Sequence, residues 1–87
     1  MTVSPALDPR PRETPPLSVR EQQVLVTWLL RDTKDGAARS LHISVGTVNT
    51  HLSRIRGKYA AVGRPAPTKA ALLARAVQDG LLDLDAL

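Results

Sequence analysis

The sequence contains no cysteine and only two aromatic residues, Trp28 and Tyr59. Without cysteine there are no disulfides, zinc–thiolate sites or thiol redox chemistry, which suits a reducing cytoplasm. With so few aromatic rings, the chain lacks a platform on which the bases of single-stranded nucleic acid could stack. Long apolar runs are also absent and the proline-rich start has no apolar core, so the sequence predicts neither a membrane span nor a signal peptide.

Acidic residues are absent from the middle of the chain. The 87 residues include 12 Lys and Arg against 8 Asp and Glu, which gives a net charge of +4. No Asp or Glu lies between Gly36 and Gln78, but seven basic residues do: Arg39, Arg54, Arg56, Lys58, Arg64, Lys69 and Arg75. Most charge runs are solvated helix faces, but an acid-free basic surface also favours binding to nucleic acid.

Apolar periodicity and capping residues together predict four helices. The expected helices cover residues 18–30, 34–41, 44–61 and 68–79. The first begins with a capping box, Ser18-Val19-Arg20-Glu21, and Gly80 is a natural stop for the fourth. A short helix, a tight turn and a longer amphipathic helix form a helix-turn-helix, so the pattern predicts a small all-α domain of this kind. A domain of this size has a thin core, which a dimer would help to complete.

The helix expected over 44–61 has two chemically opposite faces. Its apolar stripe consists of Val48, Leu52, Ile55 and Tyr59. The opposite face has hydrogen-bonding groups, positive charge and no acid; it comprises Gly46, Thr50, Ser53, Arg54 and Gly57, with Asn49 and Arg56 on one flank. Such a helix is typical of the element that enters the DNA major groove.

Residues 1–16 contain five prolines and little apolar content, so they are expected to form a semi-extended tail or linker before a domain at 17–87. A tail of this composition often follows another domain, which would make this chain the output part of a longer protein. The initial Met1 also fits a small protein, so the sequence leaves both arrangements open.

The order of motifs resembles the LuxR/FixJ (GerE-like) helix-turn-helix family. The resemblance covers about residues 17–82 and rests on Leu17 to Glu21, Val24-Leu25, Ala38, Leu41, Ile43-Ser44, Thr47-Val48, His51, Ile55 and Lys58. It implies a four-helix DNA-binding domain of a bacterial transcriptional regulator. Such a domain is usually the output of a response regulator in a two-component system, acts at the nucleoid, and binds double-stranded DNA as a dimer through its last helix.

The chain departs from the family pattern at four places. The usual glycine after the first helix is replaced around Arg31-Asp32, so this turn must be made differently. Asn49 occupies a position where a basic residue is common, and Tyr59 one where leucine is usual. About five extra residues lie between Arg64 and Gly80, which changes the expected length and pose of the fourth helix and hence the dimer geometry.

Site residues follow from the faces of the third and fourth helices. The expected base contacts are Asn49, Thr50, Ser53 and Arg54, and the expected phosphate contacts are Ser44, Thr47, Arg56 and Lys58. The resemblance places dimerisation on the fourth helix, with Ala70, Leu73, Ala74 and Val77 as candidate contacts. RNA polymerase is a further expected partner of such a regulator.

Two other functions remain open. A sigma-factor region 4-like domain also resembles the segment from Ser44 to Val48 followed by Leu52-Ser53-Arg54, although His51 and the long fourth helix argue against it. Alternatively, the apolar face of the fourth helix is the functional surface of a protein-interaction module.

Catalysis is not expected. His42 and His51 each lack a nearby acid or second ligand, so they do not make a metal site. Ser44 and Ser53 lack the acid and the oxyanion site that nucleophilic catalysis requires. We therefore expect no enzymatic activity, metal, cofactor or small-molecule ligand, and no membrane association.

Overall fold

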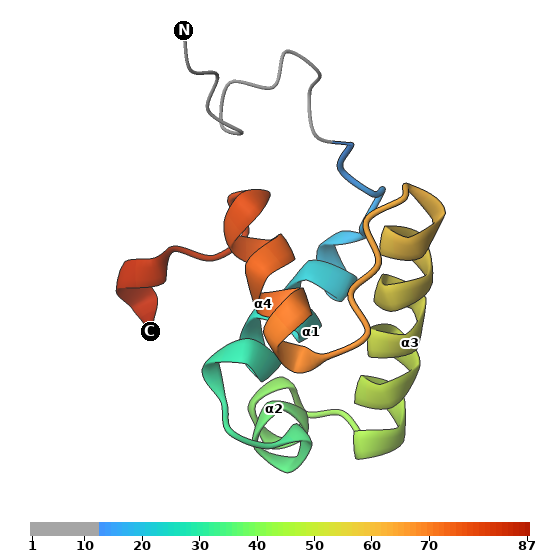
Figure 1. Ribbon diagram of the computed structural model, residues 1–87. Coiled ribbons are helices and arrows are strands. Elements are labelled where there is room, and N and C mark those ends of the chain that lie inside the picture. Colours follow the sequence, from blue (N-terminus) through green and yellow to red (C-terminus); the bar gives the residue numbers. More distant parts are fainter. Residues whose placement is uncertain (1–12) are drawn as a thin grey trace, which may run out of the picture.

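The computed structural model describes residues 13–87, which form four α-helices and a short 3₁₀-helix (Figure 1). The elements are α1 (Val19–Leu30), α2 (Lys34–Leu41), α3 (Val45–Ala61), α4 (Lys69–Gln78) and η2 (Leu84–Ala86). No β-strand occurs between residues 13 and 87, so the predicted all-α class is confirmed. Helix α3 lies along one side of the molecule, with α2 near its beginning and the loop that leads to α4 near its end (Figure 1).

Each α-helix begins behind a serine or threonine whose hydroxyl accepts the amide proton three residues later. These N-caps are Ser18, Thr33, Ser44 and Thr68. At α1 the capping box is complete, because the amide of Ser18 also donates to Glu21 Oε1 at 2.8 Å. Local hydrogen bonding thus explains why every α-helix begins within one residue of its expected position.

Three helices end in a left-handed residue. The amide after that residue reaches back five positions: Ile43 to the carbonyl of Ala38, Arg64 to that of Tyr59, and Leu81 to that of Ala76. Gly63 and Gly80 supply positive φ angles without steric cost, which confirms Gly80 as the stop of α4. After α2 this role falls to His42, with φ 56° and ψ 44°, so a residue with a side chain makes the turn between α2 and α3.

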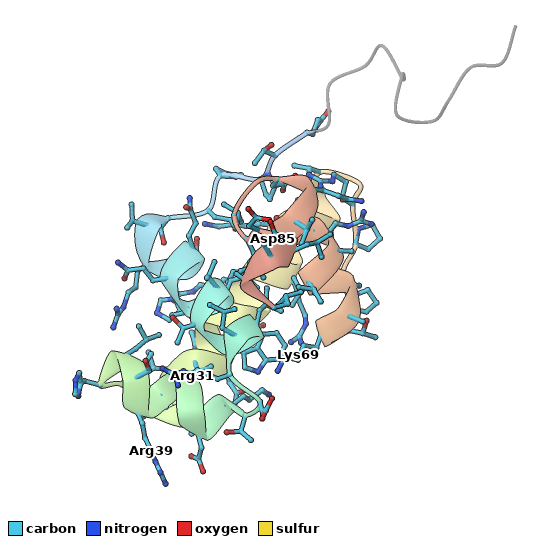
Figure 2. The ribbon with its side chains drawn as sticks, turned by 90° about the vertical axis from the view of Figure 1, so that its left-hand side faces the viewer. Arg31, Arg39, Lys69 and Asp85 are labelled. Atoms are coloured by element: carbon cyan, nitrogen blue, oxygen red, sulfur yellow. The ribbon has the colours of Figure 1, made fainter. Side chains whose placement is uncertain are left out.

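Helix α1 ends without a glycine, as the departure at Arg31-Asp32 predicted. Arg31 has an extended backbone, with φ −103° and ψ 152°. Its carbonyl accepts a hydrogen bond of 3.0 Å from the ammonium of Lys69, at the start of α4 (Figure 2). That ammonium also lies 4.7 Å from the centre of the Trp28 ring, as a cation–π contact. A side chain distant in sequence therefore supports the end of α1.

One core joins all four helices. The largest fully buried side chains include Leu25 of α1, Leu52, Ile55 and Tyr59 of α3, and Leu72 of α4. Helix α2 contributes only Ala37 and Ala38, and these small side chains let α2 pack closely against its neighbours. The stripe expected on the third helix is thus its core face, and the aromatic ring of Tyr59 takes the place in the core where the family usually has leucine.

Helix α4 packs on the core through residues other than the candidate dimer contacts. Its buried residues are Leu72 and Ala76. Ala70 and Ala74 are exposed, and Leu73 is half-buried. Besides Leu72 and Ala76, which are fully buried, Ala71 and Leu73 pack against the core while partly exposed.

The boundary between tail and domain lies earlier than expected. Residues 1–12 of the predicted tail lie outside the described residues. Of the remainder, Pro15 is buried, the carbonyl of Glu13 accepts from Arg64 Nη1 at 2.5 Å, and that of Pro16 accepts from Lys58 Nζ at 3.0 Å. Residues 13–16 are therefore packed on the domain, held by two cations that the sequence does not place near them.

Glu21 links the start of α1 to the last turns of α3. Its side chain is only 5% exposed and lies 2.6 Å from Lys58 Nζ. Burial raises the pKa of Glu21, but the hydrogen bonds from Lys58 and Ser18 and the charge of Lys58 lower it by more, so the pKa lies below its usual range. The ion pair therefore stabilises the fold at pH values above the pKa that Glu21 has in the unfolded chain. This stabilisation is lost as the pH falls through the lower pKa that Glu21 has in the folded protein.

We predict that Glu21→Gln lowers the free energy of unfolding by about 2 kcal/mol at pH 7, because a buried charge-assisted bond to Lys58 is lost while the amide can still serve the capping box. Urea denaturation at pH 7 and at pH 3 measures this, with the exposed Asp32→Asn as control. The difference from the parent should shrink below about pH 4. Equal differences at both pH values would show that the ionised carboxylate contributes nothing.

Candidate nucleic-acid interface

The outer face of α3 is open to solvent along its length. Asn49, Thr50, Ser53, Arg54 and Gly57 are all exposed, whereas the residues of the opposite stripe are fully buried. In Figure 1, one side of α3 faces away from the other helices. No acidic residue occurs within α3, so nothing on the helix would repel a phosphate backbone.

The start of α3 presents hydroxyl groups and amides together. Ser44 Oγ accepts from the amide of Thr47 at 3.0 Å and lies 2.9 Å from Thr47 Oγ1. Both residues are exposed. The first amides of a helix lack partners within the helix and carry partial positive charge, so this end of α3 is suited to an anion such as a DNA phosphate.

The four candidate base contacts lie on this face, but their side chains differ in whether they are hydrogen-bonded within the protein. Thr50 Oγ1 donates to the carbonyl of Gly46 at 3.0 Å, so its hydroxyl is engaged within the helix. Asn49, Ser53 and Arg54 have no hydrogen-bond partner for their side chains among the described residues. Their polar groups can therefore reach base edges, while Thr50 offers an apolar contact suited to a thymine methyl.

Two glycines of α3 are not required by the protein's own packing. A Cβ atom added at Gly57 would meet nothing within 4 Å, and one at Gly46 would meet only Ser44 Oγ at 3.7 Å. Glycine within a helix costs about 1 kcal/mol relative to alanine. At both positions the helix backbone is therefore open to a close approach from outside.

Arg56 and Lys58 do not lie on the open face. The guanidinium of Arg56 lies 5.9 Å from the centre of the Trp28 ring, and its buried Nε has no hydrogen-bond partner among the described residues. Lys58 is held by Glu21 and the carbonyl of Pro16. The expected phosphate contacts are thus brought together only at Ser44 and Thr47, while the two basic residues lie on the flanks of α3.

Sequence reasoning missed the partner of Lys58. The capping box accounts for Glu21 as a local feature, so nothing in the pattern indicates that the same carboxylate also binds a residue 37 positions away. The opposite charges are visible in the sequence, but their pairing depends on how α1 crosses α3.

The four candidate dimer contacts lie on the part of α4 that faces away from Leu72 and Ala76. Ala70 and Ala74 are exposed, and Leu73 and Val77 are half-buried. At the end of this face, Val77, Gly80, Leu82, Asp83 and Leu84 line a depression of about 310 Å³. Small side chains on an exposed helix allow a second helix to approach closely.

The potential metal ligands in residues 13–87 do not gather into a site. No group of three potential metal-ligating side chains occurs there. His42 makes the turn between α2 and α3, and His51 is half-buried on the side of α3 with Nδ1 unpartnered among these residues. In the described part of the chain, no helix has the length and apolarity needed to cross a membrane.

A short helix, a tight turn and a longer helix with an exposed, acid-free outer face define a helix-turn-helix DNA-binding domain. The family model described as "Bacterial regulatory proteins, luxR family" (GerE) matches residues 15–70, and the chain belongs to this family. No curated protein and no solved structure matches the chain. The family identifies a DNA-binding domain of a transcriptional regulator, as the resemblance predicted.

Proposed function

We propose that the domain reads a specific double-stranded DNA sequence by placing α3 in the major groove. The observation that carries this proposal is the exposed, acid-free face of α3, directly opposite a fully buried stripe. Asn49, Thr50, Ser53 and Arg54 contact base edges on this face. Ser44 and Thr47, at the capped start of the helix, contact the phosphate backbone and set the register of α3 in the groove.

The second part of the proposal is that two copies bind together through α4. The exposed Ala70 and Ala74, flanked by Leu73 and Val77, form the contact. A two-fold symmetric dimer places its recognition helices about one turn of DNA apart, so it reads two inverted half-sites. Family membership supports a role as the output domain of a cytoplasmic response regulator that contacts RNA polymerase once bound.

Selection of bound sequences from a random duplex pool tests both parts. The expected result is a two-fold symmetric consensus with a defined distance between half-sites. A consensus without two-fold symmetry would contradict the proposed dimer but would still support base reading by α3. Failure to bind any duplex at low salt would contradict DNA binding and leave the protein-interaction module, because the electrostatic part of DNA binding is strongest there.

Asn49→Ala and Thr50→Ala are predicted to relax specificity at one or two base pairs each. Loss of a side chain that contacts a base edge should weaken binding to the preferred sequence by about 1–2 kcal/mol and leave binding to unrelated DNA unchanged. Fluorescence anisotropy with a set of singly substituted operators measures this. Gln23→Ala, on the exposed side of α1, is the control. Variants that discriminate among the operators as the parent does would show that these residues do not read bases.

A further inference from the structure

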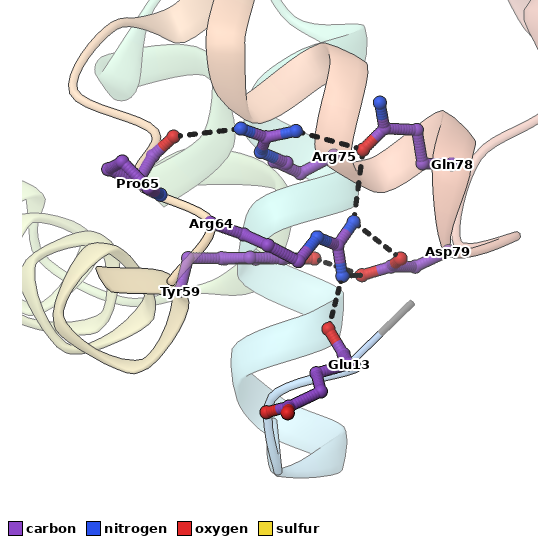
Figure 3. A network of polar contacts seen from close by, with 7 residues as sticks. All are labelled: Glu13, Tyr59, Arg64, Pro65, Arg75, Gln78 and Asp79. Carbon is purple, nitrogen blue, oxygen red and sulfur yellow. Dashed lines mark hydrogen bonds and ion pairs between the residues drawn. The ribbon is translucent and has the colours of Figure 1, made fainter. Parts of the chain in front are cut away.

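Arg64 connects three separate segments of the domain (Figure 3). Its guanidinium binds Asp79 in a fork, with Nη2 2.8 Å from Oδ1 and Nη1 3.2 Å from Oδ2. Nη2 also donates to Gln78 Oε1 at 3.0 Å, and Nη1 donates to the carbonyl of Glu13 at 2.5 Å. The end of α4, the loop after α3 and the segment before α1 therefore meet at one side chain.

The network also includes the last turn of α3. Tyr59 donates from its hydroxyl to Asp79 Oδ2 at 2.8 Å, and its ring centre lies 5.4 Å from the guanidinium carbon of Arg64. Burial, together with the hydrogen bond to Asp79 and its charge, raises the pKa of Tyr59 above its usual range, so this hydroxyl stays protonated and keeps donating. This bond gives a reason for tyrosine where the family usually has leucine.

The network is shielded from water. The side chain of Asp79 is 1% exposed and that of Arg64 is 10% exposed. Hydrogen bonds between charged groups in such surroundings are strong and directional, and the planar fork of arginine holds a carboxylate in one orientation. The ion pair therefore restricts the direction of α4 as well as its distance from α3.

Few other contacts restrict that direction. Leu72 and Ala76 are the only residues of α4 that are fully buried; Leu72 lies in its first half and Ala76 in its last turn. Lys69 holds the first turn of α4 to the carbonyl of Arg31. At the other end, Arg75 donates to the carbonyl of Pro65 and to Gln78, which extends the Arg64 network (Figure 3). The end of α4 is thus held by polar contacts to the loop after α3, in addition to the apolar contacts of Ala76 and Leu82.

We propose that Arg64 is a positioning residue that sets the angle between the dimer helix α4 and the recognition helix α3, and thereby the distance between half-sites that the dimer accepts. This inference rests on the proposed dimer through α4. Recognition helices of such a dimer lie about 34 Å apart, so each is about 17 Å from the two-fold axis. A rotation of about 10° at α4 would move α3 by about 3 Å, which is close to the rise of one base pair.

The test compares the parent with Arg64→Lys and Tyr59→Phe on duplexes whose half-sites, taken from the selected consensus, are separated in steps of one base pair. Lysine keeps the positive charge but cannot form the fork, and phenylalanine keeps the ring but cannot bind Asp79. A duplex with one half-site reports on α3 alone. We expect both variants to bind the single half-site within about twofold of the parent. On duplexes with paired half-sites, changing the separation by one base pair should weaken binding of the variants about tenfold less than it weakens binding of the parent. A difference of this size is expected from the loss of a charged hydrogen bond.

The outcomes separate the two proposals. If the parent prefers one separation and both variants keep that preference, Arg64 does not position α4, and the dimer stands. If the parent shows no preferred separation, the dimer through α4 is overturned and the positioning role with it. Should Arg64→Lys not fold, as judged by circular dichroism, Asp79→Asn decides, because an amide keeps the shape of the carboxylate but cannot accept from both Nη1 and Nη2 of Arg64. An unchanged separation profile for Asp79→Asn would then overturn the inference.

Discussion

Replacing Arg64 by methionine is expected to lower the free energy of unfolding by about 3–5 kcal/mol. The substitution leaves the Asp79 carboxylate, 1% exposed, without its charged partner. A buried charge that has lost its partner is strongly destabilising. Since small domains are stable by only about 5–15 kcal/mol, a substantial fraction of the variant should unfold at moderate temperature.

Urea denaturation followed by circular dichroism measures the change. The matched control is Arg54→Met, the same substitution at an exposed position of α3, which should alter stability by less than about 0.5 kcal/mol. The double variant Arg64→Met/Asp79→Leu should recover part of the loss, because the orphaned charge is removed as well. If Arg64→Met alone stayed within about 1 kcal/mol of the parent, the ion pair would be of no consequence for stability.

Arg54→Glu should weaken binding to the preferred DNA sequence by at least about 100-fold. Arg54 is exposed on the outer face of α3, so reversing its charge places a carboxylate against the phosphates of the duplex. Such like-charge contacts cost several kcal/mol. Arg54 has no ion-pair partner among the described residues, so the fold should tolerate the change.

Binding measured as a function of salt concentration tests this expectation. Arg20→Glu makes the same change of net charge on the exposed side of α1 and serves as the control. The control should lose less than about tenfold, since it alters only the overall field, and its salt dependence should match the parent's. The Arg54 variant should show a shallower salt dependence, because fewer counterions are released. Equal losses in the two variants would mean that net charge, and not a contact of Arg54, explains the effect.

The fold could be predicted because its determinants are local. Each N-cap accepts from an amide three residues away, so Ser18, Thr33, Ser44 and Thr68 mark the helix starts in the sequence itself. The spacing of Val48, Leu52, Ile55 and Tyr59 likewise defines the buried face of α3, and hence its open face, without knowledge of any other helix.

The tertiary structure decided the partners of the charged residues. Lys58 binds Glu21, 37 positions away, and Arg64 binds the carbonyl of Glu13, 51 positions away. Neither pairing follows from helical periodicity, and the role of Lys58 as a phosphate contact stays a prediction for a side chain that is also engaged within the fold. The packing of residues 13–16 escaped prediction for the same reason.

The sequence by itself determined the helices, the helix-turn-helix and the face of α3 on which Asn49, Thr50, Ser53 and Arg54 lie, because capping and periodicity act over three to seven residues. Only the tertiary structure decided which cations are engaged within the fold and how α4 is held against α3. Those features depend on the crossing of helices distant in the chain, where one ion pair between buried groups, such as Arg64 and Asp79, selects among orientations that the thin apolar core leaves open.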